Sequence, residues 1–269
     1  MDLNNIYIGF ALATFAGLST GIGSFLGLYS KFENKRLLSL ALGFSAGVMI
    51  YVSFMELLPL SFGSLEEVYG GTFGKLIGVS SFIMGLSIMF FIDQLFDHHS
   101  IADFISRSSN KDESVLVRTG LFSALALAIH NFPEGFATFT AAQVEIELGV
   151  TLAIAIAIHN IPEGLAVSVP IYYATKNKSK AFWISFASGL AEPLGALIGF
   201  LIIRNVYNEA LSLGVSFAFC AGIMIYVSLN ELLPVSREYG KPSDPIIGVT
   251  AGIIVMAISL ILMLSLIHI

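Results

Sequence analysis

Two copies of a short motif place metal-ligating side chains at helical spacing inside apolar stretches. The first copy is ALAIHNFPEGFA at residues 126–137, and the second is AIAIHNIPEGLA at residues 155–166. In each copy the histidine and the glutamate stand four residues apart, on one helical face. The candidate ligands are His130, Asn131, Glu134, His159, Asn160 and Glu163. Two such helices, face to face, unite two imidazoles and two carboxylates, which suits tetrahedral zinc or a related late divalent ion.

A second, oxygen-rich site is expected beside the first. Asn131 and Asn160 offer amide oxygens, and Glu134 and Glu163 would bridge the two sites. Glu192, in SGLAEPLGA, would complete the second site. Calcium and magnesium favour all-oxygen shells, so the histidines argue against them as the preferred cargo. Three carboxylates facing two dications leave a sum of about +1, so the ions repel each other and one should leave readily.

Five further residues are candidates for a supporting role along an ion pathway: Met49, Glu56, Glu231, His98 and His99. Met49 would lend a thioether, although a core methionine is the commoner explanation. Glu56 and Glu231 each precede a proline by three residues, and they would line an entrance and an exit or hold a helix break. The histidine pair would capture cytoplasmic metal or, as exposed loop histidines more often are, be inert.

Membrane-spanning helices must position these residues. The 269-residue chain is 56% hydrophobic and only 12% charged, with a formal net charge of -6, and its mean hydropathy is +0.84. Soluble domains are about a quarter charged, so the water-soluble class is nearly excluded, and the charge does not favour nucleic acid. Apolar runs of spanning length are expected at residues 6–29, 37–60, 76–96, 119–141, 148–174, 181–203, 215–236 and 245–267. They predict an all-α integral membrane protein with eight transmembrane helices in a single domain, residues 1–269.

The basic residues predict an orientation in the cell membrane. Of 13 basic residues, 11 fall in the connections that follow the first, third, fifth and seventh spans. The positive-inside rule places those connections in the cytoplasm, so both termini are expected outside. The longest connection, residues 97–118, is expected to be a polar cytoplasmic loop. The single cysteine, Cys220, lies in an apolar run and is interpreted as a small packing residue.

The outer spans contain a second internal repeat. FSAGVMIYVSFMELLP at residues 44–59 and FCAGIMIYVSLNELLP at residues 219–234 share 12 of 16 residues. They belong to the second and seventh spans, which cross in opposite directions, as inverted repeats do. The predicted plan has inverted repeats, spans 1–3 and spans 6–8, around a central antiparallel helix pair, spans 4 and 5. Such plans commonly bind an ion at the repeat interface and move it by alternating access, so this plan favours a transporter over a purely structural repeat.

Along its whole length the chain resembles the ZIP family of metal-ion transporters, the Zrt-, Irt-like proteins, and within it a bacterial group of zinc transporters. The family pattern HNxPEG appears twice, as HNFPEG and HNIPEG, and the glutamate-proline of the sixth span is Glu192-Pro193. The resemblance implies uptake of Zn²⁺ into the cytoplasm through a binuclear site, with Fe²⁺, Mn²⁺, Co²⁺ and Cd²⁺ as further cargo. It implies a first site of His130, Glu134, His159 and Glu163, and a second of Asn131, Glu134, Asn160, Glu163 and Glu192. Some members of the family carry Asp where Asn160 stands and Gln where His159 stands.

Two other functions are alternatives. A passive metal-selective channel would use the same ligands, and saturable, slow uptake would favour a carrier over it. An intramembrane zinc hydrolase is disfavoured, because zinc proteases of the HExxH kind place a glutamate where this chain has Asn131 and Asn160. No catalytic cofactor is expected, and zinc is expected as the transported substrate. The expected partners are divalent metal ions, the lipid bilayer and, as a candidate assembly, a second copy of the chain in a homodimer.

Overall fold

The computed structural model describes residues 2–29, 35–95, 111–205 and 209–267. Every regular element in these ranges is a helix, which confirms the all-α prediction. The elements are α1 (Leu3–Tyr29), α2 (Lys35–Val52), η1 (Ser53–Leu57), α3 (Leu58–Tyr69), α4 (Gly71–Leu95), α6 (Lys111–Val144), α7 (Ile146–Thr175), α8 (Lys178–Gly189), α9 (Ala191–Asn205), α10 (Glu209–Val227), η2 (Ser228–Leu232), α11 (Leu233–Tyr239) and α12 (Asp244–Ile267).

Seven helical stretches of the described chain are long and apolar enough to cross a membrane: Leu3–Tyr29, Arg36–Tyr69, Gly71–Gln94, Ile146–Val169, Lys178–Asn205, Ala210–Tyr239 and Asp244–Ile261. Each overlaps one of the predicted spans over most of its length. The remaining predicted span, residues 119–141, lies within the 34-residue helix α6. The chain is therefore a multi-pass helical membrane protein.

The polar loop predicted for residues 97–118 is wrong at its C-terminal end, because α6 already begins at Lys111. The helix thus extends beyond its apolar part. Residues 96–110, with His98 and His99, lie outside the described residues.

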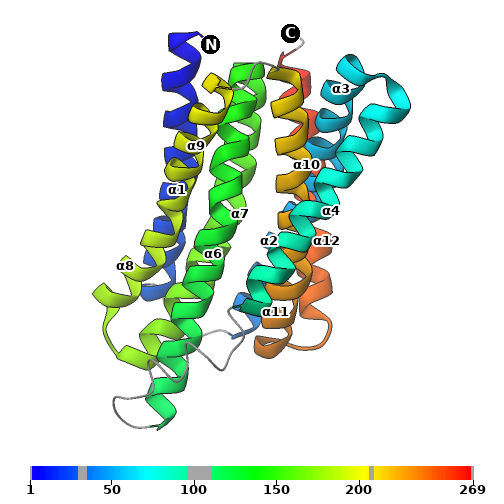
Figure 1. Cartoon of the computed structure of the whole chain (residues 1–269). Coiled ribbons are helices and arrows are strands. Elements are labelled where there is room, and N and C mark those ends of the chain that lie inside the picture. The colour runs from blue at the N-terminus through cyan, green and yellow to red at the C-terminus, as the bar shows by residue number, and fades with distance from the viewer. Residues whose placement is uncertain (1, 30–34, 96–110, 206–208, 268–269) are drawn as a thin grey trace.

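The helices run roughly along one axis, with the start of α1 and the end of α12 at the same end of the bundle (Figure 1). The α7–α8 and α11–α12 connections lie at the opposite end (Figure 1). Both ends of the described chain lie at one end of the bundle because the chain passes along the bundle an even number of times (Figure 1). The side of the membrane on which each end lies stays a prediction.

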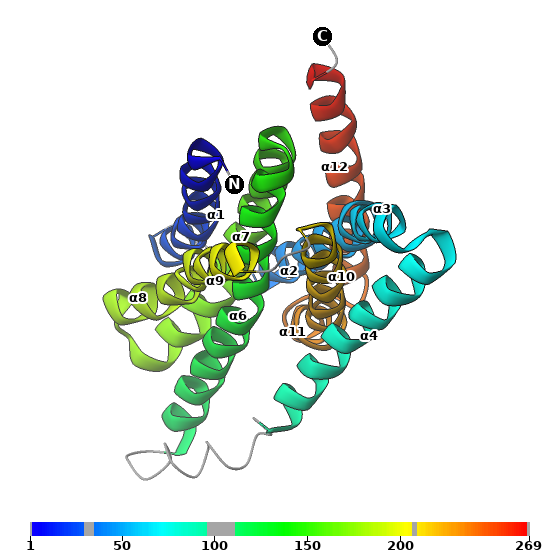
Figure 2. The same ribbon diagram turned by 45° about the horizontal axis from the view of Figure 1, so that its top comes forward.

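The helices pack in two groups (Figure 2). One, the motif group, consists of α1, α6, α7, α8 and α9, and it contains both copies of the HNxPEG motif. The other, the frame group, consists of α2, η1, α3, α4, α10, η2, α11 and α12. The two groups meet mainly along two helix pairs, α2 with α7 and α6 with α10. This boundary therefore runs beside both motif-bearing helices.

Glycines bring helices into backbone contact inside each group. In the motif group, a Cβ on Gly23 would overlap the carbonyl oxygen of Ile161. In the frame group, a Cβ on Gly47 would overlap the carbonyl oxygen of Val249. Every described glycine whose Cβ would overlap a backbone atom meets it inside its own group. The boundary between the groups is thus formed by side chains.

Both repeated segments of the frame group contain a π-helical turn at the same place. These turns are η1, Ser53–Leu57, and η2, Ser228–Leu232. Each is followed by a proline, Pro59 or Pro234, which has no N–H to donate to the carbonyl four residues earlier. A wider turn accommodates this interruption, and such turns are frequent at functional sites. Glu56 and Glu231 lie within them.

Candidate metal centre

The predicted ligands of the two motif copies lie deep inside the protein. Helices α6 and α7 pack against each other, and the motifs stand in their interiors. The fully buried side chains, each 0% exposed, are Asn131, Glu134, His159, Asn160, Glu163 and Glu192. The side chain of His130 lies outside the described residues, although its backbone belongs to α6. Three buried carboxylates in a membrane protein are costly, so their concentration here indicates a cation site.

Glu134 and His159 join the two motif copies directly. Glu134 Oε1 lies 3.1 Å from His159 Nε2, and both side chains are fully buried. The contact runs from α6 to α7, so it confirms that the facing helices bring a carboxylate and an imidazole together. An imidazole and a carboxylate at this separation are both ligands that zinc prefers.

Hydrogen bonds donated by the side-chain nitrogens of Asn131 and Asn160 orient the two amide groups. Asn131 Nδ2 donates to the carbonyl oxygen of Ser188 at 3.2 Å, and Asn160 Nδ2 donates to that of Ala16 at 3.0 Å. Asn160 Nδ2 also donates to the Glu192 carboxylate. Because an amide presents its oxygen away from its nitrogen, these bonds set the direction of both Oδ1 atoms.

Three buried oxygen atoms beside these hydrogen bonds make no hydrogen bond of their own to the described residues. Asn131 Oδ1, Asn160 Oδ1 and Glu192 Oε2 are buried, and none has a hydrogen-bond partner among the described residues. Burying a polar atom without a partner costs free energy. A divalent cation would satisfy amide and carboxylate oxygens alike. These atoms therefore form the oxygen-rich part of the candidate centre.

Glu192 reaches the centre because the sixth predicted span is broken. Helix α8 ends at Gly189 and α9 begins at Ala191, so Glu192 stands in the first turn of α9. The partial positive charge of a helix N-terminus stabilises a carboxylate there. Glycine contacts bring α9 against α6, since a Cβ on Gly135 would overlap the carbonyl oxygen of Glu192. The break and the close packing together position this carboxylate.

Glu163 is held from the other helix group. Ser45 Oγ, on α2, donates to Glu163 Oε1 at 2.9 Å, and both residues are fully buried. The sequence motifs did not indicate a role for Ser45. Its only distinguishing feature in the sequence is that it is the first mismatch in the 16-residue repeat, where it is aligned with Cys220.

The carboxylates are engaged with protein donors rather than gathered around one point. Among the described residues, no three His, Cys, Asp or Glu side chains converge closely enough to hold a metal ion by themselves. Glu134 is paired with His159, Glu163 accepts from Ser45, and Glu192 accepts from Asn160. An ion in this centre would therefore need the asparagine oxygens, and it would have to compete with these donors.

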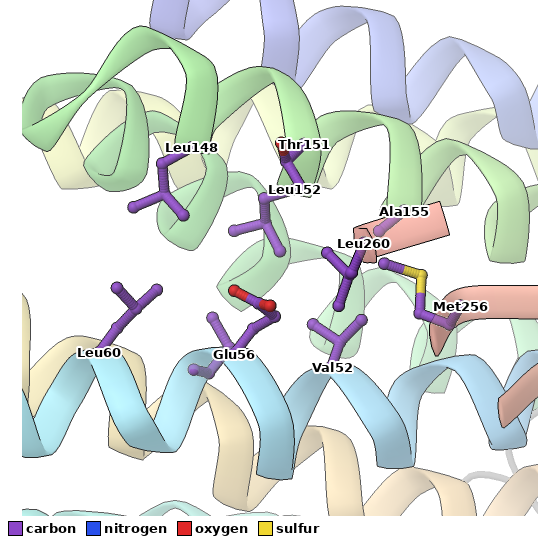
Figure 3. A pocket seen from close by; sticks show the side chains of 10 residues that line it. Val52, Glu56, Leu60, Leu148, Thr151, Leu152, Ala155, Met256 and Leu260 are labelled. Atoms are coloured by element: carbon purple, nitrogen blue, oxygen red, sulfur yellow. The ribbon is translucent and has the colours of Figure 1, made fainter. Parts of the chain in front are cut away.

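Three of the supporting candidates, Met49, Glu56 and Glu231, lie in the frame group. Met49 is fully buried in the core of α2. Glu56 is partly buried and points from η1 toward α7, into a small cavity at the group boundary (Figure 3). Leu152 and Ala155 of α7 and Met256 of α12 also line this cavity (Figure 3).

Glu231 is partly buried in η2, near a polar network that the sequence did not reveal. Asp93 Oδ2, on α4, accepts from Tyr226 Oη at 2.8 Å and from Asn230 Nδ2 at 3.1 Å. The network links α4 to α10 and η2. Asp93 is thus a further carboxylate of the frame group, beside the second π-helical turn.

Comparison with known proteins identifies the family. The family description "ZIP Zinc transporter" matches residues 4–114 and 97–260 of the chain. The chain belongs to the ZIP family. The resemblance is therefore confirmed, and this ZIP-family chain is a transporter rather than an enzyme, which removes the hydrolase alternative.

Relatives of similar length share about half of the residues of this ZIP-family chain. "Zinc transporter ZupT" of Chlorobium chlorochromatii (strain CaD3) is 51% identical, over 96% of this chain and 98% of the relative. The protein of that name from Clostridium perfringens (strain 13 / Type A) is 46% identical, over 97% and 98%. That of Campylobacter jejuni subsp. jejuni serotype O:2 is 46% identical, over 95% and 96%.

Proposed function

We propose that the chain takes up divalent transition-metal ions, chiefly Zn²⁺, across the cell membrane into the cytoplasm. The names of its relatives support zinc as the cargo. The observation that carries the proposal is the set of buried oxygens on Asn131, Asn160 and Glu192 beside the Glu134–His159 pair. Fe²⁺, Mn²⁺, Co²⁺ and Cd²⁺ are further candidate cargo, since mixed nitrogen and oxygen ligands accept all of them.

The proposed centre holds two ions. The nitrogen-containing site consists of His130, Glu134, His159 and Glu163, and the oxygen-rich site of Asn131, Glu134, Asn160, Glu163 and Glu192. The shared glutamates bridge the ions. Three carboxylates do not neutralise two dications, so repulsion between the ions favours release of one of them. This arrangement suits a protein that must let its cargo go.

Alternating access is the proposed mechanism. Backbone contacts at glycines hold each helix group together, whereas side chains form the boundary between the groups. A boundary of side chains can be remade when one group shifts past the other, and the small cavity beside Glu56 lies at this boundary. The full burial of the described ligands supports a carrier that encloses its cargo rather than an open channel.

Zinc uptake by proteoliposomes tests the shared glutamates. Glu134→Ala and Glu163→Ala should each abolish uptake, reported by an entrapped zinc-sensitive dye, because each removes a ligand common to both sites. Glu145→Ala is the matched control, because Glu145 is an exposed residue at the start of α7. Normal uptake by either folded site variant would end the shared-site proposal.

Counterflow separates the carrier from the channel. Vesicles preloaded with unlabelled zinc should take up labelled zinc faster than empty vesicles do, because a loaded carrier returns and exchanges its ion. A passive channel would instead take up labelled zinc no faster in preloaded vesicles, because entry through a pore does not require an ion to return from inside. The second result would replace alternating access by a channel while keeping the metal centre.

A further inference from the structure

Two equivalent residues of the repeated segments cross the boundary between the helix groups. Ser45 on α2 and Cys220 on α10 occupy the second position of the FSAG and FCAG sequences. Ser45 Oγ donates to Glu163 Oε1 at 2.9 Å, and Cys220 Sγ donates to the carbonyl oxygen of Pro133 at 3.2 Å. Each thus reaches one copy of the PEG sequence. The repeat places a donor at both motifs, but the acceptors differ.

The two contacts differ in strength for a chemical reason. A hydroxyl is a good donor, and a hydrogen bond to a carboxylate is about twice as strong as one between neutral groups. A thiol is a weak donor, and the carbonyl of Pro133 is not a ligand of the proposed centre. Only the Ser45 contact therefore acts on a metal ligand.

We propose that Ser45 positions the Glu163 carboxylate for the metal ion from across the group boundary, and that Cys220 has no such role. The proposal rests on the proposed function of Glu163 as a shared ligand. A hydroxyl donates one hydrogen bond, so it fixes the rotation of the carboxylate but leaves its negative charge for the cation. A ligand that is already oriented loses less conformational freedom when the ion binds.

The two shared glutamates are consequently held in different ways. Glu134 is paired with His159, and both belong to the motif group, so this pair can move as a unit. Glu163 is bonded to the frame group through Ser45, so a shift of one group past the other must exchange that bond. Ser45 thereby links the orientation of one ligand to the relative position of the two groups.

Zinc uptake by Ser45 variants in proteoliposomes tests the proposal. Ser45→Ala should raise the zinc concentration for half-maximal uptake about tenfold, which corresponds to the loss of a hydrogen bond to a charged group. The maximal rate should change less than twofold. Ser45→Thr retains the hydroxyl and should restore half-saturation to within about twofold of the unmodified protein.

The internal repeat supplies matched substitutions. Ser45→Cys introduces the residue found at the equivalent position, keeps a similar volume and weakens the donor, so half-saturation should rise about threefold. Cys220→Ala should leave half-saturation within about twofold, because the thiol donates weakly to a neutral carbonyl. Calorimetric titration of each purified variant with zinc should give the same order of affinities as the uptake assay.

Three results would overturn the proposal. Unchanged half-saturation and unchanged zinc affinity in Ser45→Ala would show that Ser45 only packs α2 against α7. If Ser45→Ala and Cys220→Ala raise the zinc concentration for half-maximal uptake equally, the change comes from disturbing the boundary between the helix groups and not from the Ser45 hydrogen bond. A Ser45→Thr variant as impaired as Ser45→Ala would show that the hydroxyl is not responsible. Failure of the proposed function itself would appear separately, as normal uptake by Glu163→Ala.

Discussion

Contacts inside the two helix groups differ in kind from contacts between them. Inside the motif group, Gly23 meets the backbone at Ile161, and inside the frame group, Gly47 meets the backbone at Val249. Between the groups, contacts such as Ser45 to Glu163 and Cys220 to Pro133 begin at side chains. Backbone contacts leave little freedom to slide, whereas side chains can change rotamers and partners. The chain thus has two groups of helices in close backbone contact, and side chains form the boundary between them.

Substitution of Gly23 or Gly47, which contact the backbone of a neighbouring helix, should have the largest effect of all, and it should be on the stability of the protein. In Gly23→Ala and Gly47→Ala the new methyl group overlaps a carbonyl oxygen of the neighbouring helix, so we expect each to cost about 1–3 kcal/mol or more. The melting temperature of the purified protein in detergent should fall for both. Gly63→Ala is the control, because its Cβ would meet no atom within 4 Å. If all three variants have the same melting temperature, the backbone contacts at Gly23 and Gly47 do not stabilise the helix groups.

His159→Ala should have the next largest effect, and it should depend on the metal. Zinc uptake should weaken roughly tenfold or more, since loss of an imidazole removes the ligand that zinc uses best. Manganese uptake should weaken less, because manganese accepts oxygen ligands. His159→Gln keeps a donor for Glu134 and should retain more uptake than His159→Ala. Equal losses of zinc and manganese uptake would show that selectivity is set elsewhere than at His159.

Asn160→Asp should tighten metal binding while it slows transport severalfold. A fourth carboxylate brings the ligand charge to about -4 and cancels two dications, so the ions repel each other less and leave more slowly. The substitution also removes the donor that bonds Ala16 and Glu192, so the variant should depend on metal for stability. Added zinc should raise its melting temperature more than that of the unmodified protein.

The control for this charge change is Asn177→Asp, at the exposed N-terminus of α8, where a carboxylate also caps a helix. Its half-saturation and maximal rate should be those of the unmodified protein. If Asn160→Asp matches this control, Asn160 only anchors α7 to α1, and the oxygen-rich site must be withdrawn.

Single cysteine substitutions should leave transport unchanged, and their labelling should show which end of the helix bundle faces the cytoplasm. In a Cys220→Ser background, a cysteine at Asn4 or Glu145 should react in intact cells with a membrane-impermeant thiol reagent. A cysteine at Lys111, at the start of α6, should react only after permeabilisation, because the positive-inside rule places it in the cytoplasm. The reverse pattern would invert the proposed direction of uptake.

The sequence was sufficient for the helices and for the burial of the described candidate ligands, whose role in metal binding stays a prediction. Apolar runs of spanning length predicted the spans, because lipid requires continuous helices. The spacing of His159 and Glu163, and the same spacing in the first motif, predicted which side chains would face each other. The Glu134–His159 contact agrees with that prediction. These features depend on local pattern, which a sequence displays directly.

Features that depend on neighbours far apart in the chain could not be predicted. Local pattern does not show that α1 joins α6–α9 while α2 joins α12. Ser45 differs from Cys220 by one atom, and its importance appears only once Glu163 lies beside it. The first turns of α6 are polar, so hydropathy placed Lys111 in a loop although helix geometry continues there.

The contact between Asn160 and Ala16 also has a consequence for the timing of synthesis. The two residues are 144 positions apart, and ribosomes add about 5–20 residues per second, so roughly 7–30 s separate their appearance. During that interval α1 resides in the bilayer before its partner helix exists. Its small-residue face, which includes Gly23 and Ser24, must then be covered by lipid or by the insertion machinery. Slowing translation between these two helices should therefore increase degradation of the nascent protein.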